Sequence, residues 1–555
     1  MQPKFIFITG GVMSGIGKGV TTASIAKLFQ FRGFTVSIMK IDPYINIDPG
    51  TMNPIEHGEC FITEEVWKYQ PVDTFDQVFN IAEIDQDFGT YERFIGKNIH
   101  PSHNLTSGQV FIEIILKERQ GEYLGKTVQI IPHATDTIKE RIERIAINEQ
   151  LDVLLIECGG TVGDLESQIF LEAFRQMCLD HPENTCLVHV TLVPFNEMVG
   201  ELKTKPTQHS VRQLQTAGLQ PDIIMCRSSI FLDDHSRRKI SLFCNVPPNC
   251  VISNPNVETV YEIPLIFEDQ GLGDTISDIL NLKPRLVEFS PVENYSEWKK
   301  LVRDYKQHES ILRIVMPGKY TKNRDSYVSI NEALKHAAAS HGVGIDINWL
   351  DTEDINNLDQ LANYDGVLLT PGFGHRGVEG MIAAADRAME SKLPFLGICF
   401  GAQLMFVAFC RRHLNRNEAN STEINPETPD PVISMMENQR EVENLGGTMR
   451  LGAHEIILVS GTKIHDAYQT NVIKERFRHR YHISPRYATM CEEHGLIVSS
   501  RDVSEKIINS IELDDNDHFC VGVQFHPEYK SRPWKPSPIY SEFIRACLKI
   551  RRDRK

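Results

Sequence analysis

The sequence predicts an α/β fold with two doubly wound parallel-sheet domains. The chain has 555 residues, which is too many for one hydrophobic core, so two large domains are expected. Short apolar runs alternate with helical segments in both halves, and this alternation is typical of a parallel sheet with helices on both faces. A charged stretch with two prolines, residues 284–310, interrupts the alternation and predicts a linker.

The first domain, residues 1–283, carries most of the predicted elements. Strands are expected at residues 4–9, 35–41, 127–131, 153–157, 187–193 and 223–226. Helices are expected at residues 19–32, 137–148 and 166–179. In such a sheet, bound ligands lie at the carboxyl ends of the strands.

The second domain, residues 311–555, starts a new alternation after the linker. Its strands are expected at residues 311–315, 344–349, 366–369, 395–398 and 519–524. The linker itself is expected to hold one amphipathic helix around Trp298.

Composition restricts the class of protein. Hydrophobic residues make up 41% of the chain and charged residues 24%, which is ordinary for a soluble globular protein. The net charge of −16 argues against a nucleic-acid partner, and no stretch approaches the ~18 apolar residues of a membrane helix. The twelve cysteines include no CxxC pair, so neither a zinc site nor a disulfide framework is indicated. We expect a cytoplasmic protein without a nucleic-acid or membrane partner.

A glycine-rich loop follows the first apolar strand. Gly11, Gly15, Gly17 and Lys18 read as GxxxxxGK, one residue longer than the common Walker A spacing. Backbone N–H groups of such a loop converge on phosphate oxygens, and the following helix N-terminus adds positive potential. Gly19 stands where a Ser or Thr usually binds Mg²⁺. The loop therefore predicts a nucleotide-phosphate site.

Acidic residues suited to Mg²⁺ lie nearby in the predicted fold. Proteins usually hold this ion with one or two carboxylates beside phosphate oxygens. Glu157 ends an apolar run, where an unpaired carboxylate would be costly, and Asp85, Asp87, Asp164 and Glu166 are further candidates.

A basic cluster, KTKPTQHS at residues 203–210, combines two lysines with neutral donors around a proline turn. Compact cations of this kind suit a second triphosphate. A solvated basic loop is the alternative for this segment alone.

A cysteine at a sharp turn marks the second half. Cys399 lies in G-x-C-x-G between a predicted strand and helix, a position that exposes a thiol and lowers its pKa. His526 and Glu528 are two residues apart, so on an extended segment Glu528 can orient the imidazole that activates Cys399. A phosphate site fused to such a hydrolase suggests ATP-driven amination, in which one half liberates ammonia and the other uses it.

Long motifs over nearly the whole chain resemble those of the CTP synthase family. In order, they are GGVMSGIGKG, KIDPYINIDPGTMNP, EHGE, DFGTYERF, GGTVGDLES, KTKPTQHSV, LFCNVP, GTMRLG, RHRY and FHPE. The resemblance implies a P-loop, Rossmann-like synthase domain fused to a class I glutamine amidotransferase domain. It also implies an ATP-dependent ligase that converts UTP to CTP with glutamine nitrogen, the last step of de novo pyrimidine nucleotide synthesis.

The resemblance assigns residues to the synthase half. ATP is expected to contact Ser14, Gly15, Ile16, Gly17, Lys18, Gly19, Lys40, Asp87 and Arg227. UTP or the inhibitory product CTP is expected at Ser14, Asp164, Leu165, Glu166, Lys203, Thr204, Lys205, Gln208, Lys239 and Phe243. Mg²⁺ is expected at Asp87 and Glu157. In this family the UTP site is shared between subunits, which implies a homotetramer and leaves filaments open.

The resemblance also assigns residues to the glutaminase half. Cys399, His526 and Glu528 are the expected catalytic residues. Glutamine and its oxyanion are expected at Gly372, Phe400, Gln403, Glu423 and Arg480, the ammonia channel at His57, and a lid that responds to the activator GTP at Thr448 and Arg450. ATP is expected to phosphorylate O4 of UTP, after which ammonia displaces phosphate at C4. Because ammonia is mostly protonated in water, it must travel directly between the sites.

The sequence departs from the family pattern at three places. Pro371 replaces a glycine of the oxyanion loop, which removes a backbone N–H and fixes φ. Phe477 and His482 stand where His and Glu are more usual, which bears on glutamine or GTP coupling. Residues 67–82 look like an insertion, and we expect them to form a surface flap.

Two alternatives remain open. Another P-loop amidoligase, such as a cobyrinic acid diamide synthase or a dethiobiotin-synthetase relative, shares the loop but would not be expected to carry KTKPTQHS. A catalytically weakened paralogue that serves assembly would keep the fold without the reaction, and an activity assay separates it from an enzyme.

Overall fold

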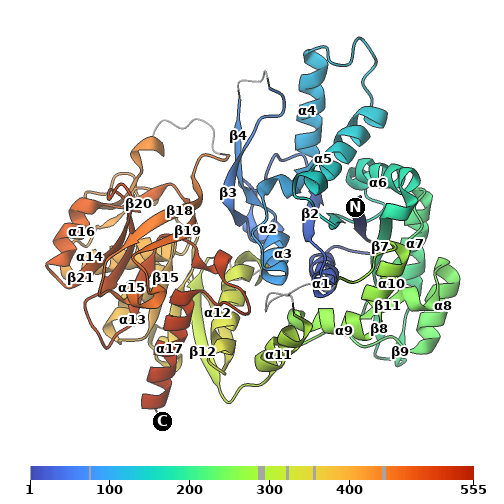
Figure 1. Cartoon of the computed structure of the whole chain (residues 1–555). Coiled ribbons are helices and arrows are strands. Elements are labelled where there is room, and N and C mark those ends of the chain that lie inside the picture. Colours follow the sequence, from blue (N-terminus) through green and yellow to red (C-terminus); the bar gives the residue numbers. More distant parts are fainter. Residues whose placement is uncertain are drawn as a thin grey trace. The chain divides into compact units, whose positions relative to one another are not determined.

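The chain forms two compact units, each built around its own sheet (Figure 1). The computed structural model describes residues 2–73, 77–285, 294–319, 324–353, 358–439 and 446–554. The first unit comprises Met1–Pro49, Trp67–Phe79 and Asp87–Lys306, and the second comprises Gly50–Val66, Asn80–Gln86 and Gln307–Lys555. Two short segments from the N-terminal half therefore belong to the second unit.

The first unit contains a seven-stranded parallel sheet. Its order is β11 (Val251–Asn254), β10 (Ile223–Arg227), β7 (Thr185–Leu192), β1 (Lys4–Gly10), β6 (Val153–Cys158), β2 (Val36–Asp42) and β5 (Asn104–Thr106). The central strands are buried along almost their whole length, as expected for strands covered on both faces.

Helices cover both faces of this sheet. On one face α1 (Lys18–Phe31) packs against α3 (Asp87–Ile95) and α9 (Ile263–Asp269). On the other, Phe5 and Phe7 join a core with α5 (Thr135–Asn148) and α6 (Gln168–Asp180). The remaining helices are α4 (Ser107–Arg119), α7 (Lys205–Thr216), α8 (Asp234–Cys244) and α10 (Leu272–Ile279).

One expectation for this half is wrong and one is confirmed. Residues 127–131 form no strand; a helical turn at Ile130–Ala134 leads into α5, and this apolar run is exposed rather than buried in the sheet. The amphipathic helix expected around Trp298 is confirmed as α11 (Tyr295–Lys306), which belongs to the first compact unit; its buried Trp298 donates through Nε1 to the Tyr261 carbonyl at 2.8 Å. Residues 286–293 of the expected linker lie outside the described residues.

The second unit contains a nine-stranded mixed sheet. Five strands are parallel: β13 (Gly344–Asp351), β12 (Ile311–Gly318), β14 (Gly366–Leu369), β15 (Phe395–Ile398) and β23 (Cys520–Val523). Four more continue it antiparallel: β22 (Ile508–Leu513), β21 (Leu496–Asp502), β18 (Arg450–Leu458) and β19 (Val472–His479). The predicted α/β class with parallel-sheet cores is confirmed, and the antiparallel extension is an addition to it.

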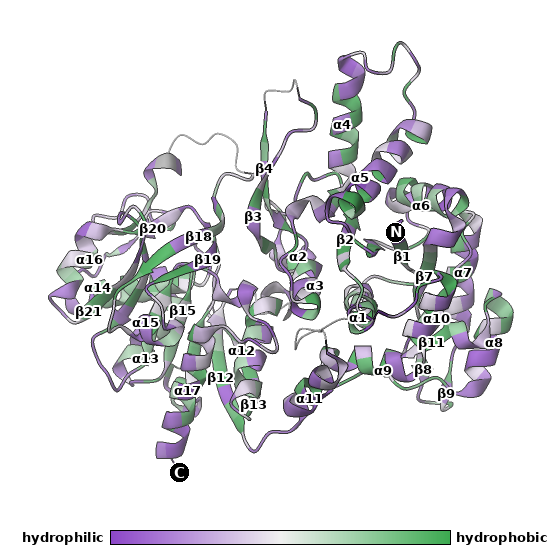
Figure 2. Ribbon diagram, viewed as in Figure 1, coloured by the Kyte–Doolittle hydropathy of each residue, from purple (hydrophilic) through white to green (hydrophobic). Residues whose placement is uncertain are grey.

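Helices again lie on both faces of the second sheet. One core gathers α13 (Val378–Glu390) and α14 (Phe400–His413), and the other gathers α12 (Val328–Ser340) and α17 (Pro538–Asp553). The smaller helices are α15 (Lys463–Tyr468) and α16 (Pro485–Glu492). A small sheet combines β16 (Asn420–Ser421), β17 (Pro431–Met435) and β20 (Tyr481–Ile483). Figure 2 shows hydrophobic central strands and a hydrophilic C-terminal end of α17.

The segment expected as a surface flap is partly a β-hairpin. It contributes to β3 (Phe61–Tyr69) and β4 (Phe79–Ile84). Tyr69 is buried and donates to the Gln109 carbonyl at 3.2 Å, and the Arg141 guanidinium lies 5.2 Å from the Trp67 ring centre. The role of this segment as a surface flap stays a prediction, and residues 74–76 lie outside the described part. Among the described residues, no helix has both the length and the apolar character needed to cross a membrane.

Candidate active sites

The glycine-rich loop joins the end of β1 to the start of α1, as the sequence predicts. Gly15, Gly17 and Val12 have positive φ angles of 72°, 83° and 77°, the left-handed region that glycine adopts without strain. Lys18 begins α1, and its Nζ donates to the Gly160 carbonyl at 2.7 Å. The glycine-rich loop and Lys18 thus meet the loop that follows β6 at one edge of the sheet.

A buried ion-pair cluster lies beside this loop. Lys40 Nζ contacts Asp87 and lies 3.1 Å from Glu157 Oε1. The other Glu157 oxygen accepts from the Thr22 hydroxyl at 3.0 Å and from the Tyr91 hydroxyl at 2.6 Å. Burial, followed by the negative charge of Glu157, raises the pKa of Tyr91 well above its usual value. The paired hydrogen-bond donors explain how a carboxylate can remain at the end of an apolar strand.

A steric constraint explains why a glycine, Gly19, follows the loop lysine. A Cβ built on Gly19 would lie 2.4 Å from Asp87 Oδ1, which is far inside van der Waals contact. Gly19 therefore lets the Asp87 carboxylate approach the start of α1. Asp87 and Glu157 meet through Lys40 and suit Mg²⁺ held together with phosphate oxygens. The described residues contain no group of three or more His, Cys, Asp or Glu side chains arranged to hold a metal ion by themselves.

The residues expected to contact UTP fall on several elements. Lys205 begins α7 and its Nζ lies 5.7 Å from the Phe243 ring centre. Buried Gln208 donates to the Thr204 hydroxyl at 3.1 Å, while its Oε1 has no partner among the described residues. Lys203 pairs with Glu201, and Lys239 is exposed on α8.

The remaining nucleotide residues surround the same edge of the sheet. Asp164 accepts from the Thr161 N–H at 2.9 Å, and Leu165 and Glu166 beside it are exposed. Arg227 ends β10, lies within 3.9 Å of a Cβ built on Gly17, and donates to the Asn254 carbonyl at 3.1 Å. Ser14 is exposed in the loop and Ile16 is buried beneath it.

Cys399 occupies the predicted strand-to-helix turn between β15 and α14. Its φ of 52° and ψ of −104° are strained for a non-glycine residue, as is common where a nucleophile is presented. Cβ atoms on the flanking Gly397 and Gly401 would lie 2.9 Å from Gly401 C and 2.2 Å from Leu369 O. Both glycines of G-x-C-x-G are therefore required by close backbone approach.

His526 and Glu528 form the predicted pair beside Cys399. His526 Nδ1 lies 2.7 Å from Glu528 Oε1, and both side chains are buried. The extended-segment argument is wrong in detail, because Pro527–Lys530 form a 3-10 turn that brings Glu528 back to the ring. Burial alone lowers the pKa of His526, but Glu528 and Cys399 outweigh it and raise that pKa to about 10.

The second ring nitrogen of His526 is available to the thiol. Nε2 has no well-aligned hydrogen-bond partner among the described residues, although Cys399 is near enough to raise the pKa of the ring. The Cys399 Sγ lies 3.6 Å from the Arg478 carbonyl and 3.5 Å from Gln524 Nε2. The arrangement can activate a thiol as a nucleophile.

The residues expected to bind glutamine lie around this thiol. Phe400 starts α14 directly after Cys399, and Gln403 one turn later donates to Gln524 Oε1 at 2.9 Å. Glu423 accepts from the Gly374 N–H at 2.7 Å, and burial raises the pKa of this carboxyl. Arg480 donates to Gln439 Oε1 at 2.8 Å.

The expected oxyanion loop is held by a lysine that sequence reasoning missed. Buried Lys319 contacts the Gly374 carbonyl and donates to the Phe373 carbonyl at 3.1 Å, next to Gly372. Burial lowers the pKa of Lys319 to about 8. The available signal was a lysine directly after strand β12, at the carboxyl edge where ligands bind. The Pro371 carbonyl accepts a hydrogen bond from the Tyr327 hydroxyl at 3.3 Å.

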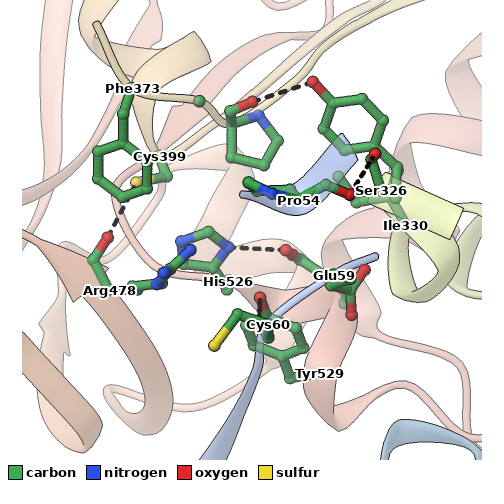
Figure 3. A pocket seen from close by; sticks show the side chains of 14 residues that line it. Pro54, Glu59, Cys60, Ser326, Ile330, Phe373, Cys399, Arg478, His526 and Tyr529 are labelled. Carbon is green, nitrogen blue, oxygen red and sulfur yellow. Dashed lines mark hydrogen bonds and ion pairs between the residues drawn. The ribbon is translucent and has the colours of Figure 1, made fainter. Parts of the chain in front are cut away.

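A small pocket of about 50 Å³ adjoins Cys399 (Figure 3). Cys399, His526 and Arg478 line it together with Pro54, Glu59 and Cys60. Pro54 begins the short helix α2 (Pro54–His57), at whose end His57 is exposed. The volume suits a molecule of the size of water or ammonia, and the six residues come from distant parts of the sequence.

Strand β19 connects the expected catalytic residues to the N-terminal segments of the same unit. Its side chains reach those segments: Arg478 Nε lies 2.8 Å from Glu83 Oε1, and Arg476 donates to the Ile62 carbonyl at 2.7 Å. Its carbonyls face the site, because the Arg476 carbonyl accepts from the His526 N–H at 2.8 Å. Sequence reasoning missed Arg476, Arg478 and Glu83, which lie in different motifs.

The expected lid residues lie at the start of β18. Thr448 is half-buried, and Arg450 lies 3.9 Å from the Phe477 ring centre and donates to Asn509 Oδ1 at 3.0 Å. Burial lowers the pKa of Arg450 to about 10. Phe477, one of the departures from the family pattern, therefore packs directly against an expected GTP-responsive residue.

Two family models match the chain. The model described as CTP synthase N-terminus matches residues 4–282, and the model described as Glutamine amidotransferase class-I matches residues 323–546. The two matches separate the phosphate-loop half from the half that contains Cys399.

Curated relatives match the whole chain. The CTP synthases of Saccharolobus solfataricus and Pyrococcus abyssi are 48% and 46% identical to it over 559 and 555 residues. These alignments cover 99% of this chain and 100% and 99% of the relatives. A solved structure of the Trypanosoma brucei CTPS glutaminase domain with bound acivicin aligns to 43% of this chain and 94% of its own, at 30% identity and a TM-score of 0.40.

Proposed function

This chain belongs to the CTP synthase family and converts UTP to CTP with ATP and glutamine nitrogen; we propose that it does so through 4-phosphorylated UTP and ammonia released at Cys399. The observation that carries the proposal is the Cys399–His526–Glu528 arrangement beside a pocket that Pro54 and Cys60 also line. These last two residues lie within the part of the sequence matched by the synthase model.

The phosphoryl-transfer step is proposed for the loop edge of the first sheet. Lys18 and Lys40 supply positive charge where the phosphates of ATP would lie, which stabilises the charge on a transferring phosphoryl group. Asp87 and Glu157 would hold Mg²⁺, which neutralises phosphate charge when bound. Lys203, Lys205 and Gln208, on and before α7, are proposed to hold the UTP triphosphate.

The amide-hydrolysis step is proposed for Cys399. His526 takes the thiol proton through Nε2 while Glu528 holds Nδ1, and the thiolate attacks the glutamine amide. The imidazolium returns the proton to the departing nitrogen, which leaves as ammonia, and water then hydrolyses the glutamyl thioester to glutamate. The backbone N–H groups of Gly372 and Phe400 are proposed as oxyanion donors. Gln403, Glu423 and Arg480 are proposed to bind the amino-acid end of glutamine.

The ammonia route is proposed to begin in the pocket beside Cys399. The pocket is large enough for ammonia. Pro54 lies in it, and α2 continues from Pro54 to His57, which we propose lies at the far end of the route. A closed route keeps ammonia from being protonated in bulk water.

The partners of the family are proposed for this chain as well. Ile115, Leu124, Ile130 and Ile131 are exposed on and between α4 and α5, and an apolar surface of this kind favours association with a second copy. This supports a homotetramer. CTP is proposed as a feedback inhibitor near Phe243, and GTP as an activator acting through Thr448 and Arg450.

The experiment measures CTP formation from UTP, ATP and Mg²⁺, with glutamine and separately with ammonium, for the wild type and Cys399→Ala. We expect both nitrogen donors to support the wild type and only ammonium to support the variant. A wild type that uses ammonium alone would contradict the glutaminase assignment. Binding of UTP and ATP without CTP from either donor would favour the assembly alternative.

A further inference from the structure

A buried histidine joins the phosphate-loop strand to the helix proposed to bind UTP. His189 lies on β7 opposite Thr9 of β1, and neither side chain reaches solvent. His189 Nδ1 is hydrogen-bonded to the Thr9 hydroxyl at 2.8 Å, and Nε2 to the Ser210 hydroxyl of α7 at 2.7 Å. The imidazole therefore spans the space between two separate elements of the synthase half.

The first residue of the phosphate loop packs on this bridge. A Cβ built on Gly11 would lie 1.5 Å from Ser210 Oγ and 3.1 Å from His189 Nε2. The Gly11 N–H also donates to the Val190 carbonyl of β7 at 3.0 Å. The position of the loop entrance is thus set by direct contact with the His189–Ser210 hydrogen bond.

The same bond holds the middle of α7 (Lys205–Thr216). Ser210 lies in the same helix as Lys205 and Gln208. Lys205 and Gln208 are the two α7 residues that we propose hold UTP. A second buried bond, between the Thr191 and Thr207 hydroxyls at 2.6 Å, also joins β7 to α7. The three atoms nearest to a Cβ built on Gly11 all belong to Ser210 and His189, and none belongs to Thr191 or Thr207.

The bridge is uncharged. Burial, followed by the nearby positive charge of Lys18, lowers the pKa of His189 to about 3. The ring is neutral at physiological pH, so one nitrogen donates and the other accepts. Its contribution is geometric, because it supplies no charge to either nucleotide.

We infer that His189 is a positioning residue that sets the distance between the phosphate loop and α7, so that the phosphoryl donor and its acceptor meet. The inference rests on the proposed placement of ATP at the loop and UTP at α7. Phosphoryl transfer requires the reacting atoms to be held close together and aligned, and a misplacement of about 1 Å can cost about 10²-fold in rate.

The test uses substitutions that separate the two ends of the bridge. In His189→Asn the amide lies near the Nδ1 position, and the hydrogen bond to the Ser210 hydroxyl is lost. In His189→Gln the longer side chain reaches the Nε2 position and can keep that hydrogen bond. We expect kcat for ammonium-dependent CTP formation to fall about 10- to 100-fold in His189→Asn and Ser210→Ala. We expect His189→Gln to recover most of that loss, and Thr191→Val, the matched control, to stay within about threefold of the wild type.

Binding provides a readout that does not depend on turnover. Individual dissociation constants for UTP and for a non-hydrolysable ATP analogue should change little in Ser210→Ala. The factor by which the analogue tightens UTP binding should fall toward one. Basal glutamine hydrolysis at Cys399 should be unchanged and reports correct folding of the second unit.

Two results would overturn the inference. One is a Ser210→Ala variant with wild-type kcat and wild-type binding coupling. The other is weakened binding of each nucleotide alone with kcat intact, which would mean that the bridge only supports each site separately. A wild type that forms no CTP from ammonium would instead refute the proposed function, while the binding coupling would still decide the role of His189.

Discussion

The Arg478–Glu83 ion pair should be one of the most consequential contacts of the second unit. The side chain of Glu83 is 1% exposed and that of Arg478 is 11% exposed, with 2.8 Å between Arg478 Nε and Glu83 Oε1. Arg478 also donates to the Gly50 carbonyl at 3.1 Å. Removal of one partner leaves the other charge buried, and such losses cost about 3–5 kcal/mol.

The perturbation is a double-mutant cycle of Arg478→Met and Glu83→Gln. Each single variant should lower the free energy of local opening by about 3 kcal/mol or more. The double variant should be less destabilised than the sum of the two, with a coupling energy of about 1–3 kcal/mol. Arg387→Met is the matched control, because Arg387 pairs with Asp359 and Glu390 at the surface and should cost less than about 1 kcal/mol.

The assay is native-state hydrogen exchange of backbone amides in β19 and residues 80–86, which measures local opening free energies. Glutamine hydrolysis should fall in the single variants, since the Arg478 carbonyl lies 3.6 Å from Cys399 Sγ. The reasoning would be refuted if Arg478→Met destabilised β19 no more than Arg387→Met does. Additive effects in the double variant would show that the two side chains do not interact.

Three further substitutions test the close contacts and the buried charges. Gly19→Ala should lower kcat for ammonium-dependent CTP synthesis about 10²-fold, because the new Cβ would lie only 2.4 Å from Asp87 Oδ1 and would push this carboxylate away. Unchanged kinetics would contradict the steric argument. Gly401→Ala should destabilise the second unit by about 1–3 kcal/mol and impair glutaminase activity alone, since its Cβ meets Leu369 O at 2.2 Å; parallel loss of ammonium-dependent synthesis would count against it. Burial raises the pKa of Glu475 from 4.5 to about 7, so the folded state holds this proton longer than the unfolded state, and stability should fall by about 3 kcal/mol as pH rises from 4.5 to 7. Thermal melts of Glu475→Gln should lack that slope, whereas profiles parallel to the wild type would show that Glu475 ionises normally.

Local sequence patterns predicted the catalytic turns because backbone geometry there depends on a few neighbouring residues. The loop before Lys18 and the turn at Cys399 both need glycines within a few positions, and their strands lie within a few residues of the predicted bounds. The triad residues His526 and Glu528 do meet, although through a 3-10 turn. The residue-by-residue assignment of nucleotide contacts stays a prediction.

Long-range contacts could not be predicted in the same way. Arg478 and Glu83 are 395 positions apart, and no local periodicity marks such a pair. The run at residues 127–131 has the composition of a strand, but it is exposed and followed by Pro132, which has no N–H to donate to a sheet. Trp298 likewise reads as part of an amphipathic linker helix, and only the structure shows that it is buried against Tyr261.

The membership of residues 50–66 and 80–86 in the second unit has a consequence for how the chain is made. These segments leave the ribosome early, yet Glu64 and Glu83 pack against Arg476 and Arg478, which follow 412 and 395 residues later. At synthesis rates of about 5–20 residues per second, their partners arrive roughly 20–80 s afterwards. For that time the nascent chain carries a β3–β4 hairpin without its later packing partners, and two unpaired carboxylates. A fragment that begins at residue 311 would have the opposite problem, because Arg476 and Arg478 would lack the Glu64 and Glu83 carboxylates that accept from them.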